Sequence, residues 1–242
     1  MNNAQLYELD DVVAKYSALT TRVRQLNIPE RELIDELNIT KKDVLIVGGG
    51  AARIPANLLL LGNRVTSVEL SEKLHAAALA IYPPADFPRL TLKQGDARDL
   101  SFLPDNSFDF AYFNGLDLIE TMDGRCKAIR EMARVVRSGG NIAFMSHSLN
   151  GHAFSYKLPK ATKRMRLTFS DYAFEQIPGV QGGGIQFKAK PEFVIRQAQD
   201  VTGLQFIKLF ADRRNRFDYA ALTRPWLREF VFPWYLMAFR KP

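Results

Sequence analysis

The chain has 242 residues, 47% hydrophobic and 24% charged, with 33 Lys and Arg against 26 Asp and Glu. These fractions are typical of a soluble globular protein and exclude a disordered or collagen-like chain. The single cysteine, Cys126, excludes an intrachain disulfide and a cysteine-rich zinc site, so we expect no metal site and a reducing, cytoplasmic setting. The N-terminus lacks the apolar core of a signal peptide, and no apolar run is long enough for a transmembrane segment.

The first part of the chain predicts helices followed by a buried strand. Residues 1–40 read as an N-terminal helical cap, in which 29–37 begins with proline and has apolar residues at helical spacing. The run 44–47 is apolar on both faces and leads directly into three glycines. Such a strand belongs in the middle of a parallel sheet that helices cover on both sides.

Helical and strand patterns then alternate as far as residue 145. The predicted helices are 54–61, 71–81 and 122–137, and the predicted strands are 64–70, 90–93, 108–113 and 141–145. This alternation predicts an α/β fold with a doubly wound, mostly parallel, Rossmann-like sheet.

The pattern is interrupted after the fifth strand. Residues 147–190 contain several glycines and prolines and a basic cluster, and we expect them to form a substrate lid. A helix over 191–201 and strands over 204–211 and 234–239 follow, the last strand being antiparallel at the edge of the sheet. We therefore expect one domain over 1–242, divided into the cap 1–40, a cofactor-binding half 41–146, the lid 147–190 and a closing part 191–242.

The glycines after the first strand predict a cofactor site. Gly48, Gly49 and Gly50 lead into a helix whose free N-terminal amides favour a ligand, and glycine allows the backbone to approach it closely. Glu69 ends the second strand, where a carboxylate can accept hydrogen bonds from the hydroxyl groups of a ribose. A glycine loop combined with this acid indicates an adenosine-type cofactor. Arg53 stands where a dinucleotide fingerprint requires its last glycine.

Three further segments occur in a characteristic order: Gly95-Asp96-Ala97 after the third strand, 103–109 before the fourth, and 134–140 before the fifth. Together with the glycine loop they resemble the class I S-adenosylmethionine-dependent methyltransferases, in particular the small-molecule branch that includes the ubiquinone and menaquinone biosynthesis type. The resemblance covers about 41–145 and the closing strands. It implies a seven-stranded sheet with an antiparallel last strand and S-adenosyl-L-methionine as cofactor.

The resemblance also implies which residues bind the cofactor: Gly48, Gly49, Gly50, Ala52, Glu69, Leu70, Asp96, Ala97 and Asn114. The glycine loop matches the part that approaches the methionine moiety, Glu69 the ribose-binding acid, and Asp96 with Ala97 the adenine contacts. Two positions depart from the family pattern. Ile46 replaces an acid that helps to hold the methionine end, and Ala52 replaces the third glycine of the loop.

Methyl transfer from a sulfonium requires alignment of the acceptor and, for some acceptors, removal of a proton. Asp117 and His147 follow the fourth and fifth strands and are the candidate catalytic bases. We expect a small-molecule acceptor. The basic residues of 145–170 and 213–228 suggest an anionic one, and aromatic residues suggest an aromatic pocket, namely Tyr112, Phe113, Phe154, Tyr156, Phe169 and Tyr172.

Three alternatives remain open from the sequence. An RNA-modifying methyltransferase would use the basic clusters, although residues 113–116 lack the Asn-Pro-Pro-aromatic tetrapeptide of some nucleic-acid methyltransferases, so nucleic acid is not the expected partner. A non-catalytic relative would explain Ile46. Membrane-surface binding would use Trp226, Phe230, Phe232 and Trp234 beside Arg224 and Arg228.

Overall fold

The computed structural model describes residues 2–22, 25–149, 170–176, 184–211 and 234–242. Its helices are α1 (Asn3–Leu6), α2 (Asp10–Arg22), α3 (Ile28–Glu36), α4 (Arg53–Leu60), α5 (Glu72–Ile81), the short 3-10 helix η1 (Leu116–Leu118), α6 (Met122–Val135) and α7 (Pro191–Thr202). Its strands are β1 (Asp43–Val47), β2 (Arg64–Glu69), β3 (Leu90–Gln94), β4 (Phe108–Phe113), β5 (Val136–Ser148), β6 (Tyr172–Gln176), β7 (Ile185–Ala189), β8 (Gln205–Phe210) and β9 (Trp234–Arg240).

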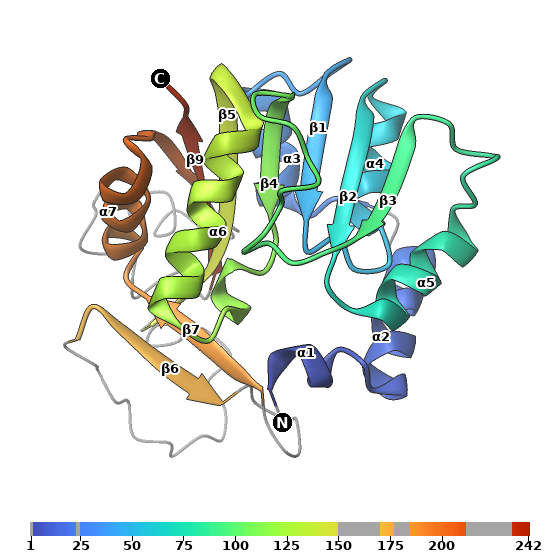
Figure 1. Cartoon of the computed structure of the whole chain (residues 1–242), viewed down its shortest axis with the longest axis horizontal. Helices are drawn as coiled ribbons and strands as arrows, with labels where there is room; N and C mark the ends of the chain where they lie inside the picture. The colour runs from blue at the N-terminus through green and yellow to red at the C-terminus, as the bar shows by residue number, and fades with distance from the viewer. Residues whose placement is uncertain (1, 23–24, 150–169, 177–183, 212–233) are drawn as a thin grey trace.

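A central sheet organises the molecule. The strands β3, β2, β1, β4 and β5 lie side by side in that order and are all parallel, and β9 runs antiparallel along the other edge of β5 (Figure 1). The predicted doubly wound, mostly parallel α/β fold with an antiparallel last strand is confirmed. The last strand does not lie at the edge, however, because β8 pairs with its outer side. The side chains of Tyr235 to Phe239 are fully buried, which fits a strand paired on both edges.

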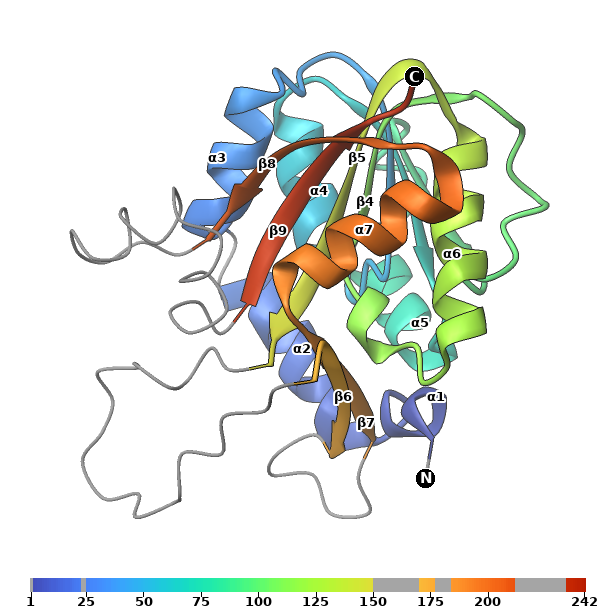
Figure 2. The ribbon, with the colours of Figure 1, turned by 90° about the vertical axis from the view of Figure 1, so that its left-hand side faces the viewer.

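Helices cover the two faces of the sheet separately (Figure 2). Side chains alternate along β1, so that Val44 and Ile46 pack in one cluster with α3 and α4, whereas Leu45 and Val47 pack in a second cluster with α6 and α7. Because both faces are covered, β1 is buried almost throughout, as its apolar sequence predicts.

The segment predicted as a lid contains regular structure in its described part. Strands β6 and β7 pair antiparallel as a hairpin, and β7 runs parallel to the end of β5, with Lys188 beside His147. His147 also pairs with Trp234 of β9, so β7 uses the edge of β5 that β4 leaves open after Phe113. The hairpin therefore adds two strands to the expected seven and extends the sheet past the end of β4.

Candidate functional site

The glycine loop between β1 and α4 is tightly packed against neighbouring strand ends. The amides of Gly48 and Gly49 donate to the carbonyl of Val68, at 2.9 and 3.3 Å. Gly48 has φ +69°, and a Cβ atom there would lie 2.3 Å from the carbonyl oxygen of Asn114. Gly50, by contrast, has φ +55° and no atom within 4 Å of the place that a Cβ would take. The loop thus leaves open space beside Gly50, where a ligand can contact the backbone.

Glu69 lies directly against this loop. Its Oε2 accepts a hydrogen bond from the amide of Gly50 at 2.7 Å, and its Oε1 accepts one from the amide of Ser71 at 3.0 Å. Burial raises the pKa of Glu69 above its ordinary value, and the amides of Ser71 and Gly50 counteract part of that rise. The structure therefore brings together the acid and the glycine loop that the sequence placed 19 residues apart.

The residues after β3 complete this side of the site. Burial disfavours the ionised form of Asp96, but hydrogen bonds from Arg98 outweigh it, so the pKa of Asp96 lies below its ordinary value. The Arg98 side chain donates Nε to both carboxylate oxygens of Asp96, at 3.0 and 2.9 Å. Ala97 is partly buried against the core. Leu70, after β2, is 46% exposed.

A cavity of about 550 Å³ joins these elements. All but one of the residues predicted to bind cofactor or catalyse line it: Gly48, Gly49, Gly50, Glu69, Leu70, Asp96, Ala97, Asn114, Asp117 and His147. Ala52 does not line the cavity, because it is fully buried behind the loop, with φ +70° at the start of α4. A volume of this size suits a nucleoside-sized ligand with a small second molecule.

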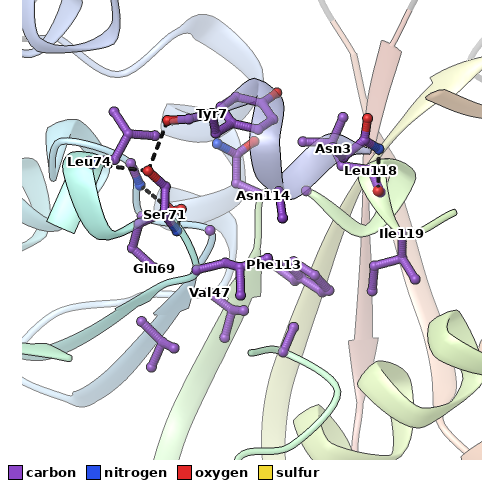
Figure 3. A pocket seen from close by; sticks show the side chains of 18 of the residues that line it. Asn3, Tyr7, Val47, Glu69, Ser71, Leu74, Phe113, Asn114, Leu118 and Ile119 are labelled. Carbon is purple, nitrogen blue, oxygen red and sulfur yellow. Dashed lines mark hydrogen bonds between the residues drawn. The ribbon is translucent and has the colours of Figure 1, made fainter. Parts of the chain in front are cut away.

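The N-terminal segment forms one wall of the cavity, which the sequence did not predict in this detail. Figure 3 shows the carbonyl oxygen of Tyr7 accepting a hydrogen bond from the Ser71 hydroxyl, at 2.9 Å. On the opposite side, Asn3 Nδ2 donates to the carbonyl of Leu118 at 2.5 Å (Figure 3). The same atom donates to the carbonyl of Ile185 at 2.6 Å. Tyr7 and Tyr16 both line the cavity.

The two candidate bases meet at the end of the cavity near β5. His147 Nδ1 lies 2.8 Å from Asp117 Oδ2, and the Gln186 side-chain amide donates to the same oxygen at 2.8 Å. Gln186 Nε2 also lies 2.9 Å from His147 Nδ1, so the three side chains form one hydrogen-bonded group at the cavity wall. The sequence predicted Asp117 and His147 separately and missed Gln186, because no local pattern indicates which residue of a distant hairpin pairs beside β5.

A buried arginine contacts the segment that carries Asp117. Arg125 of α6 is fully buried, and its Nη1 donates to the carbonyl of Leu116 at 2.5 Å. Its guanidinium lies 3.6 Å from the ring centroid of Phe187 on β7. Burial lowers the pKa of Arg125 to about 10, although the charge of Asp117 opposes this. Arg125 thus links η1, which carries Asp117, to the strand that carries Gln186.

The remaining sequence predictions have mixed outcomes. Phe113 lines the cavity, whereas Tyr112 is buried and Tyr172 packs against Phe187 and Phe193. The other predicted pocket aromatics, both basic clusters and the group from Arg224 to Phe232 lie outside the described residues. Within the described part of the chain, no group of three or more His, Cys, Asp or Glu side chains could hold a metal ion.

Comparison with known proteins decides the family. A methyltransferase-domain family model matches residues 45–144. The chain is 30% identical over 155 residues to a phosphatidylethanolamine N-methyltransferase from Cereibacter sphaeroides. The match covers 62% of this chain and 73% of the relative. The chain is a class I S-adenosylmethionine-dependent methyltransferase. Its cofactor is S-adenosyl-L-methionine, and the open space beside Gly50 with the carboxylate of Glu69 behind it fits a nucleoside cofactor of this kind.

Solved structures share the fold of this methyltransferase. A TehB-like methyltransferase from Corynebacterium glutamicum is 17% identical, with a TM-score of 0.58, and the match covers 96% of this chain and 97% of that one. The glycopeptide N-methyltransferase MtfA, solved in complex with S-adenosyl-L-methionine, is 19% identical, with a TM-score of 0.60. The match covers 88% of this chain and 86% of MtfA. No helix in the described part of the methyltransferase is both long and apolar enough to cross a membrane.

Proposed function

We propose that this methyltransferase methylates an oxygen or nitrogen nucleophile of a small molecule, with His147 as the general base and Asp117 as the residue that orients it. The observation that carries the proposal is the 2.8 Å contact between His147 Nδ1 and Asp117 Oδ2 at the wall of the cavity. A carboxylate on Nδ1 fixes the imidazole ring and its tautomer and stabilises the imidazolium that forms when Nε2 takes a proton.

We assign the cofactor to the glycine-loop side of the cavity. Gly48, Gly49 and Gly50 contact it through their backbone, and Glu69 accepts hydrogen bonds from the ribose hydroxyls. Asp96, Ala97 and Leu70 surround the adenine, and Asn114 lies between the cofactor and the acceptor. The free space at Gly50 and the lone pairs of Glu69 that its backbone donors leave unused support this assignment.

S-adenosylmethionine supplies an activated methyl group on a sulfonium, with a neutral thioether as the leaving group. His147 Nε2 accepts the proton that the acceptor oxygen or nitrogen loses as its bond to the methyl carbon forms. Asp117 keeps its charge and holds the imidazole in place, while Gln186 holds Asp117. The remaining contribution of the chain is to align the acceptor, since displacement at the methyl carbon needs an in-line approach.

The charges along the cavity favour an amine as acceptor. The described lining residues include four carboxylates, on Glu69, Asp96, Asp117 and Glu120. The two lining arginines, Arg53 and Arg98, are each paired with a carboxylate. Such a surface attracts a cationic ammonium group more than an anion. The name of the curated relative, a phosphatidylethanolamine N-methyltransferase, points in the same direction, so ethanolamine-type amines come first among the acceptors to test.

The test measures S-adenosylhomocysteine formation with a panel of acceptors: ethanolamine, phosphoethanolamine, phosphatidylethanolamine vesicles, a catechol and transfer RNA. We expect turnover with a small amine or phenol. His147→Asn should lower kcat by about 10²- to 10⁴-fold while the cofactor Kd stays within about twofold. His75→Asn is the matched control, because His75 lies on α5 and does not line the cavity. Turnover of RNA alone, with a steep loss of binding in salt, or full activity of His147→Asn, would contradict the proposal.

A further inference from the structure

Ile46 stands where an acid would help to hold the methionine end of the cofactor, and it offers no polar group. The side chain of Ile46 is fully buried and packs in the cluster of α3 and α4, with Leu33 and Ile54 among its members. Ile46 pairs in the sheet with Tyr112, whose burial raises its pKa well above the ordinary value. This part of the chain therefore needs another source of polar contacts if it holds a charged amino-acid group.

A partly buried ion pair belongs to the helices that cover this same face of the sheet. Arg53, the first residue of α4, donates Nη1 to Glu30 Oε2 at 2.9 Å and Nη2 to Glu30 Oε1 at 2.7 Å. Glu30 is only 3% exposed and is fixed at the start of α3, where its Oε2 also accepts the amide of Asn27 at 2.9 Å. Leu33 of α3 and Ile54 of α4 pack in the same cluster as Ile46 and Tyr112, so the helices that carry the pair cover this part of the sheet. Position 46 has no carboxylate, but the neighbouring helix α3 carries one at Glu30.

The pairing leaves part of Arg53 available. A guanidinium has five N–H donors, and Glu30 takes the edge formed by Nη1 and Nη2. The carbonyl of Gln25 accepts from Nη1 at 3.2 Å. Among the described residues, no partner is recorded for the edge formed by Nε and the second Nη2 hydrogen. Arg53 lines the cavity directly after the glycine loop, and its side chain keeps 24% of its surface exposed.

We propose that Arg53, held by Glu30, binds the α-carboxylate of the cofactor's methionine moiety and so provides a polar contact that Ile46 cannot make. The free edge of the guanidinium matches a carboxylate, which it can bind through two parallel hydrogen bonds. Glu30 fixes the guanidinium plane, which reduces the entropy lost on binding. Glu30 also neutralises the charge of Arg53, so that the pair does not repel the sulfonium and ammonium groups of the same cofactor. This inference rests on the cofactor of the family and does not depend on the proposed acceptor or base.

The test is calorimetric binding of two ligands that differ in the carboxylate alone, S-adenosylhomocysteine and its decarboxylated analogue. Arg53→Met should weaken S-adenosylhomocysteine by about 10- to 100-fold and the analogue by less than about twofold. Arg53→Lys should lie between Arg53→Met and wild type, because an ammonium cannot bind a carboxylate through a planar fork. Glu30→Gln keeps a residue suited to the capping box of α3 but frees the arginine, and it should weaken S-adenosylhomocysteine selectively and to a smaller extent.

Arg64→Met is the matched control. Arg64 also pairs with a carboxylate, that of Asp43, but both residues begin their strands, at the opposite end from the glycine loop. Normal binding of the decarboxylated analogue by Arg53→Met shows that the variant is folded. Equal weakening of both ligands would assign the pair a purely structural role and overturn the proposal. Unchanged binding of S-adenosylhomocysteine, with or without a raised KM for an anionic acceptor, would overturn it as well.

Discussion

His147 and Asp117 are 30 residues apart in the chain, and their side chains meet at 2.8 Å. Strands β4 and β5 are parallel neighbours, so η1, which follows β4, lies beside the last residues of β5. The Asp117 side chain is almost fully buried, whereas His147 is 30% exposed. The pair therefore has a shielded orienting carboxylate and an imidazole that remains accessible from the cavity.

We expect Asp117→Asn to impair catalysis more than cofactor binding. The amide keeps the size of the side chain but removes the negative charge that stabilises an imidazolium at His147, so kcat should fall by about 10²- to 10⁴-fold. The cofactor Kd, measured by calorimetry, should stay within about threefold, since Asp117 lies at the acceptor end. Gln186→Ala should cause a smaller loss of kcat, because the contact between Asp117 and His147 remains. A normal kcat for Asp117→Asn would contradict the orienting role.

Arg125→Met should destabilise the fold by about 2–4 kcal/mol, because it removes a buried charged donor and leaves the Leu116 carbonyl without this partner. The value can be measured by urea unfolding. Arg130→Met is the control, as Arg130 lies on the exposed side of the same helix and should change the free energy of unfolding by less than about 0.5 kcal/mol. Equal changes in the free energy of unfolding for the two substitutions would show that Arg125 does not stabilise η1.

Two of the three positive-φ positions of the glycine loop, Ala52 and Gly48, should respond to substitution in opposite ways. Ala52 has φ +70°, which strains a residue with a Cβ atom, so Ala52→Gly should raise the free energy of unfolding by up to about 1 kcal/mol and Tm by about 2–4 °C. Gly48→Ala should lower Tm, because its Cβ would meet the Asn114 carbonyl oxygen, a backbone atom that cannot move aside. Calorimetric melting of both variants checks this, and a stabilising Gly48→Ala would show that the loop is looser than described.

Cofactor affinity should increase with pH in the range above the ordinary Glu pKa of 4.5. Burial raises the pKa of Glu69, so the free protein still holds a proton there at a pH at which an exposed glutamate is ionised. A protonated Glu69 is a poorer acceptor for ribose hydroxyls, so protons and cofactor compete, and Kd should increase as pH falls through the raised pKa. Glu69→Gln should bind weakly at every pH and lose this dependence. A flat Kd profile for wild type would argue against ribose contact by Glu69.

The sequence predicted the cofactor half well, because its signals are local. The apolar run 44–47, the three glycines and the serine before α5 each determine structure within a few residues, and the observed elements β1, α4 and α5 lie where they were expected. Glu69 could be assigned to the glycine loop because consecutive parallel strands place their carboxyl ends at one edge of the sheet. Ala52 was assigned to the cofactor by its place in the motif, and the structure removes it from the cavity wall, since the chain turns there into α4.

The acceptor half could not be predicted to the same depth, because its contacts join residues distant in the chain. Gln186 reaches Asp117 across 69 residues, and Asn3 reaches Ile185 across 182. No local pattern encodes such pairings, which depend on which edge of β5 remains open after β4 ends.

The sequence by itself determined the fold class, the cofactor and the family, since periodicity, glycine spacing and the acid after the second strand act over short distances. Only the tertiary structure decided that Asp117, His147 and Gln186 form one hydrogen-bonded group and that Glu30 pairs with Arg53. These side chains belong to separate elements, and their distances follow from strand order, register and helix packing. Strand order, register and helix packing arise from the burial of apolar surface over the whole chain, so no single segment determines them.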